Sequence, residues 1–329
     1  MGRHMKSNGL MHLAATALFA GMLFSTVAPA QNYPAKPVRI IVPQSAGGST
    51  DLVARAIGKM LGEAMGQAFF VENRPGAGSI IGSDAVAKAV PDGYTLLMVA
   101  ASFSINPSAY LKLPFDPVRD FSPVTQISAF PNTLVVQSSS PFKTVQEFIA
   151  YARENPGKLN YASSGVGTGT HLSMEMMKYM AKLFIVHIPY KGGAPAVNGL
   201  LGGQVQVNLA TISTALPHVK SGALRALAVS TAQRWPLTPE LPTLAEAGLA
   251  GYDYSSWVGM LAPAKTPAAV INRLWNESAK AARSAEMKKI FAQEAAEPVG
   301  NSPEQFAANI EREIATWKKV VEAAGIKPE

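Results

Sequence analysis

Two short segments of the sequence place glycines and hydroxyl side chains directly before an apolar helical pattern. The first reads VPQSAGGSTDLVAR over residues 42–55, and the second reads LNYASSGVGTGTHL over residues 159–172. Glycine leaves backbone N–H groups uncovered, and the first N–H groups of a helix have no partner within it. These groups lie at the positive end of the helix dipole, where a bound anion is favoured. The two segments therefore predict an anion site, and residues 43–51 and 163–171 contain no lysine or arginine.

The elements around these segments must place both loops at one site. Residues 38–42 read as a buried strand before the first loop, and Ser49, Thr50 or Asp51 can cap the helix that follows. A short strand likewise precedes the second loop. Two such loops would suit two domains that close on one ligand.

The alternation of apolar runs with helical patterns predicts an α/β protein with largely parallel sheets. We expect strands over residues 38–42, 69–72, 94–99, 133–136, 205–209 and 224–229. We expect helices over residues 51–65, 79–89, 144–154, 171–182 and 194–201, and further helices between 267 and 324. No low-complexity linker separates two halves, so the chain is expected to cross between domains more than once.

Enzymatic motifs are largely missing from the sequence. It contains neither the nucleophile pattern G-x-S-x-G nor the phosphate-binding pattern G-x-x-x-x-G-K-[ST], and the glycines of residues 165–169 lack the dinucleotide spacing G-x-G-x-x-G. No cofactor is therefore expected. His171 and Glu175 have the spacing of two metal ligands on a helix, but nothing suggests a third, so no metal is expected.

Ser164 and His171 keep one enzymatic alternative open. A hydroxyl and an imidazole could act as nucleophile and base in a secreted serine hydrolase. Such a triad needs an orienting acid, which the sequence does not reveal. The expectation is a binding protein without catalytic residues.

The N-terminus has the pattern of an export signal. Residues 1–4 resemble vector-derived residues, and a basic residue followed by the apolar run 13–24 ends near the small-residue triplet 28–30. This pattern predicts a signal peptide within residues 1–30, with the mature chain beginning near Gln31. The apolar run is shorter than the roughly 20 residues of a spanning helix. We expect a soluble periplasmic protein.

Charge and cysteine content exclude further classes of partner and of chemistry. The formal charge of +7 becomes +5 once Arg3 and Lys6 are removed, and the remaining basic residues are scattered. Nucleic acid is therefore not expected as a partner. The 329-residue chain has no cysteine, which excludes disulfides, thiol chemistry and cysteine metal sites.

The order of motifs along the mature chain resembles one protein family. The segments YPAKPVRIIVP, AGGSTDLVAR, VENRPGAG, PDGYTLLM, LPFDPVRDFSPVT, PGKLNYASSGVGTGTHL, HIPYKGGAPAVNGLLGGQV, LRALAVSTAQR and LPTLAEAG are similar to those of Bug-type substrate-binding proteins of tripartite tricarboxylate transporters. The resemblance implies a two-domain type II periplasmic binding protein with two crossover strands. It also implies a small carboxylate ligand, aliphatic or aromatic, and membrane permease subunits as partners. A monomer is expected.

The resemblance also implies positions for the ligand site. Carried over, they are Ala46, Gly47, Gly48, Ser49, Thr50 and Asp51 in the first loop; Ser164, Gly165, Thr168, Thr170 and His171 in the second; and Ser102, Asn208 and Thr211 elsewhere. An aromatic residue is usual in the family where this chain has Gln44, which offers a polar contact instead. The ligand's identity therefore does not transfer.

The expected domain boundaries follow from the same resemblance. Residues 31–125 and 229–329 should form the first domain, and residues 126–228 the second. The crossover strands are expected near residues 124–127 and 224–230.

Overall fold

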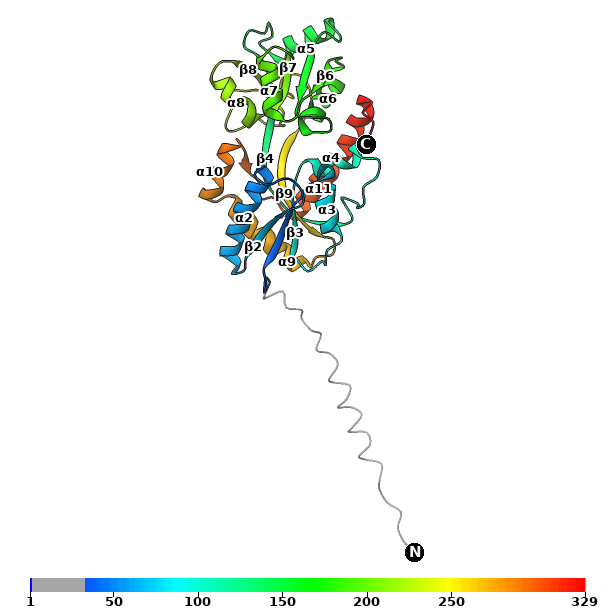
Figure 1. Cartoon of the computed structure of the whole chain (residues 1–329), viewed down its shortest axis with the longest axis vertical. Coiled ribbons are helices and arrows are strands. Elements are labelled where there is room, and N and C mark those ends of the chain that lie inside the picture. The colour runs from blue at the N-terminus through cyan, green and yellow to red at the C-terminus, as the bar shows by residue number, and fades with distance from the viewer. Residues whose placement is uncertain (2–32, 329) are drawn as a thin grey trace. The chain divides into compact units, whose positions relative to one another are not determined.

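The computed structural model of the chain describes Met1 and residues 33–328. From Pro34 onward the chain forms one compact unit (Figure 1). The predicted signal peptide and its cleavage point fall on residues outside this description, apart from Met1. Among the described helices, none has the length and apolar character that crossing a membrane requires.

Half of the strands form what we call the first sheet region. There β1 pairs in parallel with β2 and β3, and β9 is antiparallel to β3 and to the N-terminal half of β4. These strands are β1 (Val38–Val42), β2 (Phe69–Asn73), β3 (Thr95–Ala100), β4 (Phe121–Gln137) and β9 (Ser255–Pro263). The helices that follow its first three strands are α2 (Ser49–Met65), α3 (Ile80–Ala87) and α4 (Ser102–Ala109).

The remaining long strands form the second sheet region with the C-terminal half of β4. β5 pairs in parallel with β6 and β7, while β7 and β8 are antiparallel to β4. These strands are β5 (Asn160–Ser163), β6 (Val186–Pro189), β7 (Val207–Thr211) and β8 (Leu224–Val229). The helices here are α5 (Val145–Glu154), α6 (Gly169–Ala181), α7 (Gly193–Leu201) and α8 (Ile212–Lys220).

β4 is the strand that joins the two regions. It pairs with β9 from Phe121 to Pro131 and with β7 from Asn132 to Val136. The first crossing was expected near residues 124–127, within this strand. The second was expected near residues 224–230, but the strand that β8 pairs with is the C-terminal half of β4, in the second region. The chain returns to the first region later, through residues 230–254 and β9, as Figure 1 shows.

The C-terminal helices complete the first region and reach toward the second. They are α9 (Ala268–Ala282), α10 (Ala285–Gln293) and α11 (Pro303–Ala324), with the short β10 (Glu297–Pro298) paired to β4. α11 begins with a capping box, in which Ser302 and Gln305 satisfy each other's backbone N–H groups. It packs against α4, α6 and β4, so it contacts elements of both regions.

Most expected elements are present, and one central strand was missed. β9 lies between β3 and β4, yet its polar start at Ser255 and Ser256 and its internal Gly259 hide the strand pattern. A Cβ at Gly259 would lie 2.3 Å from the ring of Phe306 on α11, so this glycine lets the helix approach the sheet. The antiparallel pairs made by β4, β8 and β9 also correct the expectation of largely parallel sheets. The domain boundaries stay a prediction.

Candidate ligand-binding site

The first loop, residues 43–48, joins β1 to α2 and is held by one carboxylate. Asp51, which is 2% exposed, accepts hydrogen bonds from the Gly47 N–H at 2.9 Å, from Arg55 Nε at 3.0 Å and from Asn73 Nδ2 at 2.9 Å. Asn73 Nδ2 also reaches the carbonyl oxygen of Gln44 at 3.1 Å. Burial opposes the ionisation of Asp51, but the bonds from Arg55, Gly47 and Asn73 outweigh it and lower its pKa. Its carboxylate therefore positions the loop.

The second loop, residues 164–168, joins β5 to α6 and is held by hydroxyl groups. Thr170 Oγ1 accepts from the Ser164 N–H at 2.9 Å and lies 2.7 Å from Ser164 Oγ and 3.1 Å from Thr168 Oγ1. Thr168 is also the N-cap of α6, where its side chain accepts from the His171 N–H. Gly165 and Gly167 have φ angles of 138° and 73°, which only glycine adopts at little cost.

His171 lies beneath this loop and not at its surface. It is 4% exposed, and its Nδ1 accepts a hydrogen bond from the Gly167 N–H at 3.1 Å. Burial, as the main cause, and the positive charge of Lys178 together lower the pKa of His171 to about 4. The imidazole is therefore neutral at pH 7.

The hydrolase alternative finds no support in this arrangement. Ser164 Oγ is bonded to Thr168 and Thr170, whereas His171 Nδ1 serves Gly167. Within residues 33–328 no hydrogen bond joins Ser164 to His171. Glu175, the expected helical neighbour for a metal pair, instead accepts from Tyr161 and from Lys178.

A cavity of about 200 Å³, which we call the cleft cavity, lies between the two loops. Six of the residues expected at the site line it: Gln44, Ser102, Ser164, Thr168, Thr170 and Thr211. Three helices begin at its wall, because Ser102 opens α4, Gly169 opens α6, and Thr211 is the N-cap of α8. Helix N-termini thus converge here from both sheet regions.

The other expected positions lie outside this lining. Ala46, Gly47 and Gly48 are exposed on the first loop, and Ser49 is partly exposed at the start of α2. Gly165 is partly exposed on the second loop. Four further residues are buried: Thr50, Asp51, His171 and Asn208. Two of the expected residues have a buried side-chain oxygen without a hydrogen-bond partner in the described part of the chain: Ser102 Oγ and Asn208 Oδ1.

Several lining residues were not predicted from the sequence: Ala100, Ala101, Ile105, Asn132, Gly169, Tyr254 and Ser256. Asn132 lies where β4 changes partners, and Ser256 lies at the start of β9. Tyr254 packs its hydroxyl against α6, because a Cβ at Gly169 would lie 2.0 Å from that oxygen. Of these residues, only Gly169 lies in a glycine-rich loop that the sequence pattern had indicated as part of the site.

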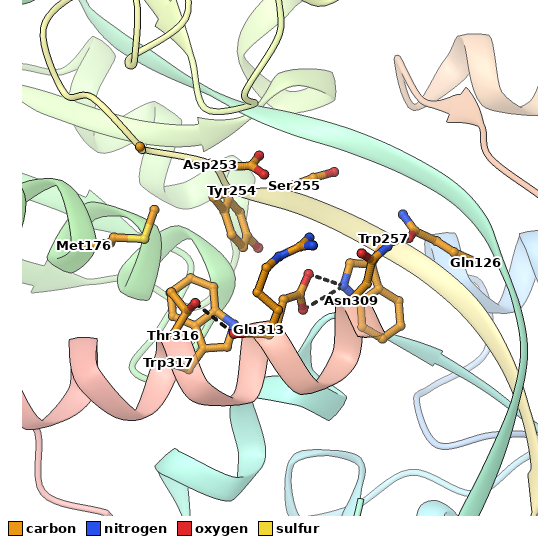
Figure 2. Close-up of a pocket in the computed structure, with 12 residues that line it drawn as sticks. Gln126, Met176, Asp253, Tyr254, Ser255, Trp257, Asn309, Glu313, Thr316 and Trp317 are labelled. Carbon is orange, nitrogen blue, oxygen red and sulfur yellow. Dashed lines mark hydrogen bonds between the residues drawn. The ribbon is translucent and has the colours of Figure 1, made fainter. Parts of the chain in front are cut away.

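A second cavity, of about 340 Å³, lies beside β9, and we call it the rear cavity. Figure 2 shows Ser255 and Trp257 of β9 at this cavity, whereas Ser256 lines the cleft cavity. Side chains alternate between the two faces of a strand, so the two cavities lie on opposite faces of β9. Tyr254 borders both.

Glu313 of α11 ties the wall of the rear cavity together. Its carboxylate accepts from Trp257 Nε1 at 2.9 and 3.0 Å, as drawn in Figure 2, and from Ser104 Oγ at 2.5 Å. Burial raises the pKa of Glu313 to about 7, although the bonds from Ser104 and Trp257 act to lower it. One group thereby links α11 with α4 and β9.

Comparison with known proteins places this architecture in a family. The sequence model of one protein family, described as "Tripartite tricarboxylate transporter family receptor", matches residues 53–326. Protein BugT of Bordetella pertussis is 36% identical over 300 residues, which cover 91% of this chain and 92% of BugT.

Solved structures agree with this result. The R. palustris protein Rpa4515, solved with adipate, has a TM-score of 0.75 and 38% identity, over 90% of this chain and all of that one. The periplasmic binding protein BugD has a TM-score of 0.72 and 33% identity over the same shares. The chain therefore belongs to the tripartite tricarboxylate transporter receptor family, whose Bug-type members are periplasmic solute-binding proteins.

Proposed function

We propose that this chain binds a small carboxylate in the cleft cavity and delivers it, in the periplasm, to the permease subunits of a tripartite tricarboxylate transporter. The protein would act as a monomer that closes its two sheet regions on the solute. The closed form would be selected by the ligand, since only that form offers both loops at once.

The observation that carries this proposal is the chemistry of the cavity wall. Its lining contains hydroxyls, carboxamides and helix N-termini, but no lysine, arginine, aspartate or glutamate. Each helix N-terminus stabilises an anion by about 0.3–1 kcal/mol when exposed, and by up to about 2 kcal/mol when partly buried. Neutral donors and helix dipoles together suit a carboxylate better than a cation or a fully apolar molecule.

An adjoining cavity indicates where the rest of the solute would lie. This cavity, of about 220 Å³, shares Ser102 and Thr168 with the cleft cavity. Its other lining residues combine apolar side chains, among them Ala109, Val166 and Ile326, with the polar Asn106 and the basic Lys327. A carboxylate with an apolar body fits this pair of cavities, and the similarity to a protein solved with adipate supports the same class.

Calorimetry with a panel of carboxylates tests the proposal directly. The panel should hold mono-, di- and tricarboxylates, adipate and aromatic diacids, each beside its uncharged amide. Saturable binding of a carboxylate but not its amide is expected, and mass spectrometry should recover that solute unchanged. If no carboxylate binds, or if a product appears, the proposal is wrong.

A variant of Thr170 tests the placement of the solute. Thr170→Val keeps the volume of the side chain but removes the hydroxyl that holds Ser164 and Thr168. We expect affinity to fall at least tenfold, because the Ser164 N–H and the Ser164 and Thr168 hydroxyls lose the partner that holds them in the cleft wall. Thr238→Val is the matched control, because that buried hydroxyl has no hydrogen-bond partner in the described chain. Equal affinities in the two variants would place the solute elsewhere.

A further inference from the structure

The second loop rests on a stack of three aromatic rings from neighbouring elements. The rings of His171 on α6 and His187 on β6 lie 4.1 Å apart between centroids, and Tyr161 on β5 lies 4.7 Å from His187. The planes are nearly parallel, with angles of 18° and 17°. In the sequence His187 opens the segment HIPYKGGAP, and nothing local indicates that its ring packs beneath the second loop.

His187 reaches the loop through one hydroxyl. Its Nε2 lies 2.6 Å from Ser163 Oγ, and that oxygen also bonds to the N–H and the carbonyl of Gly165, each at 3.1 Å. All three bonds are satisfied together only if His187 Nε2 and the Gly165 N–H donate to Oγ while the hydroxyl donates to the Gly165 carbonyl. This assignment places the proton of His187 on Nε2.

His171 supplies the second connection. Its Nδ1 accepts from the Gly167 N–H, which requires that Nδ1 carry no proton. The two imidazoles thus hold the two glycines whose φ angles depart most from those of other residues in this loop. Gly167 contacts the stack directly through His171 Nδ1, whereas Gly165 is connected to it through Ser163 Oγ.

We propose that His187 is a positioning residue for ligand binding: through Ser163 and through the ring of His171, it holds the second loop in the conformation that presents its donors to a carboxylate. This inference rests on the function proposed above. His187 itself does not line the cleft cavity.

Burial is the main reason that both rings remain neutral, and the charged groups around the stack add smaller effects. Glu175 and Lys178 of α6 bond to each other, and Glu175 also accepts from the Tyr161 hydroxyl. Burial is the main cause that lowers the pKa of His187 to about 4, with His171 and Lys178 lowering it and Glu175 raising it. Burial and the Glu175 carboxylate raise the pKa of Tyr161, so the phenol keeps its proton. The stack is therefore uncharged at pH 7.

The test compares His187→Phe with His187→Gln. Phenylalanine keeps a ring in the stack but has no nitrogen for Ser163, whereas the glutamine amide can donate at nearly the same reach. His218→Phe is the matched control, because His218 lies on α8, outside the stack. Exchange of the Gly165 and Gly167 amide hydrogens is followed by NMR at pH 7 without ligand, and the affinity for the tightest carboxylate of the panel is measured separately.

We expect His187→Phe to speed exchange at Gly165 at least tenfold, because the bond to Ser163 is lost, and to weaken carboxylate binding at least tenfold. Exchange at Gly167 should change less, because the phenyl ring still packs against His171. His187→Gln should return the Gly165 exchange rate and the affinity to within threefold of the unmodified protein, and His218→Phe should leave them unchanged. If His187→Phe acted only by lowering the overall stability, glutamine at this position would not restore exchange and affinity.

The inference is overturned if His187→Phe exchanges and binds like the unmodified protein, or if glutamine fails to restore what phenylalanine loses. Should His187→Phe not fold, His187→Asn replaces it, because its amide is too short to reach Ser163. If the unmodified protein binds no carboxylate, the proposed function fails, while the exchange rates still decide whether His187 holds the loop.

Discussion

The first and second loops are both rich in glycine and hydroxyl residues but are held by opposite kinds of group. In the first loop an ionised carboxylate, Asp51, gathers the Gly47 N–H, Arg55 and Asn73. In the second, neutral hydroxyls and two neutral imidazoles hold the glycines. The difference teaches that glycine and hydroxyl content predicts where a binding loop lies, but not what fixes its shape.

The largest expected effect comes from removing the charge that holds the first loop. Asp51→Asn keeps the volume of the side chain but weakens the bonds to Arg55 and Gly47. Hydrogen bonds to charged groups contribute about 1.5–3 kcal/mol, so we expect the free energy of unfolding to fall by about 2–3 kcal/mol. Urea unfolding at pH 7 measures this loss. An unchanged midpoint would mean that neutral groups suffice in this loop as well.

Adding one methyl group at the end of each loop should destabilise the protein to different extents, because the two positions differ in available space. At Gly169 a Cβ would lie 2.0 Å from the Tyr254 hydroxyl, whereas at Gly48 it would meet only the Ser45 carbonyl at 3.8 Å. We expect Gly169→Ala to destabilise the protein by about 1–3 kcal/mol and to weaken binding, because Tyr254 must move within the cleft wall.

Gly48→Ala is the control for that variant, since the φ of Gly48 is −81°, an angle that alanine adopts readily. Thermal unfolding of both variants provides the measurement. Similar losses in the two variants would contradict the difference in packing described here.

The smallest expected effect concerns pH. The pKa values of His171 and His187 are about 4, below the ordinary 6.5, so the unfolded chain binds protons that the folded chain does not. Their contribution to stability is therefore lost as pH falls from about 6.5 to about 4. The pKa of Asp51 is also lowered, but from an ordinary value of 3.8. The first loop should therefore keep the contribution of Asp51 until the pH falls below about 3.8.

Glu313 opposes the histidines over part of this range. Its pKa of about 7 lies above the ordinary 4.5, so its contribution decreases as pH rises from about 4.5 to about 7. In a Glu313→Gln background the free energy of unfolding should therefore increase more steeply between pH 4.5 and 6.5. The free energy of unfolding should increase by an amount on the order of 1 kcal/mol over this pH range, and adding His187→Phe should make the increase smaller. Urea titrations at several pH values measure these slopes, and a slope unaffected by His187→Phe would contradict the prediction.

Local patterns in the sequence revealed the parts of the fold that depend on neighbours along the chain. β1, α2 and α6 follow from apolar runs and glycines that lie within a few positions of one another. The expected cap of α2 was wrong, because Gly48 is its N-cap and no side chain of Ser49, Thr50 or Asp51 caps it. β9 did not follow, because Gly259 serves a distant contact with Phe306. α4 and α8 were missed too; each contains an internal proline, a residue that usually breaks a helix.

The same limit applies to the candidate site. The two loops could be predicted, and six of the named residues line the cleft cavity. Asn132 and Tyr254 could not, because they reach the cavity through strand pairing and the packing of α6. His171 was expected at the ligand, but its ring is enclosed by Tyr161 and His187, whose proximity no local pattern reveals.

The alternation of side chains along β9 gives the protein an internal optical reporter. Trp257 is 2% exposed and donates to Glu313 on the face of the strand opposite to the cleft cavity. A solute in that cavity cannot quench this indole by direct contact. A change in its fluorescence on adding a carboxylate would therefore report movement of the strand itself, and Trp257→Phe would identify the signal.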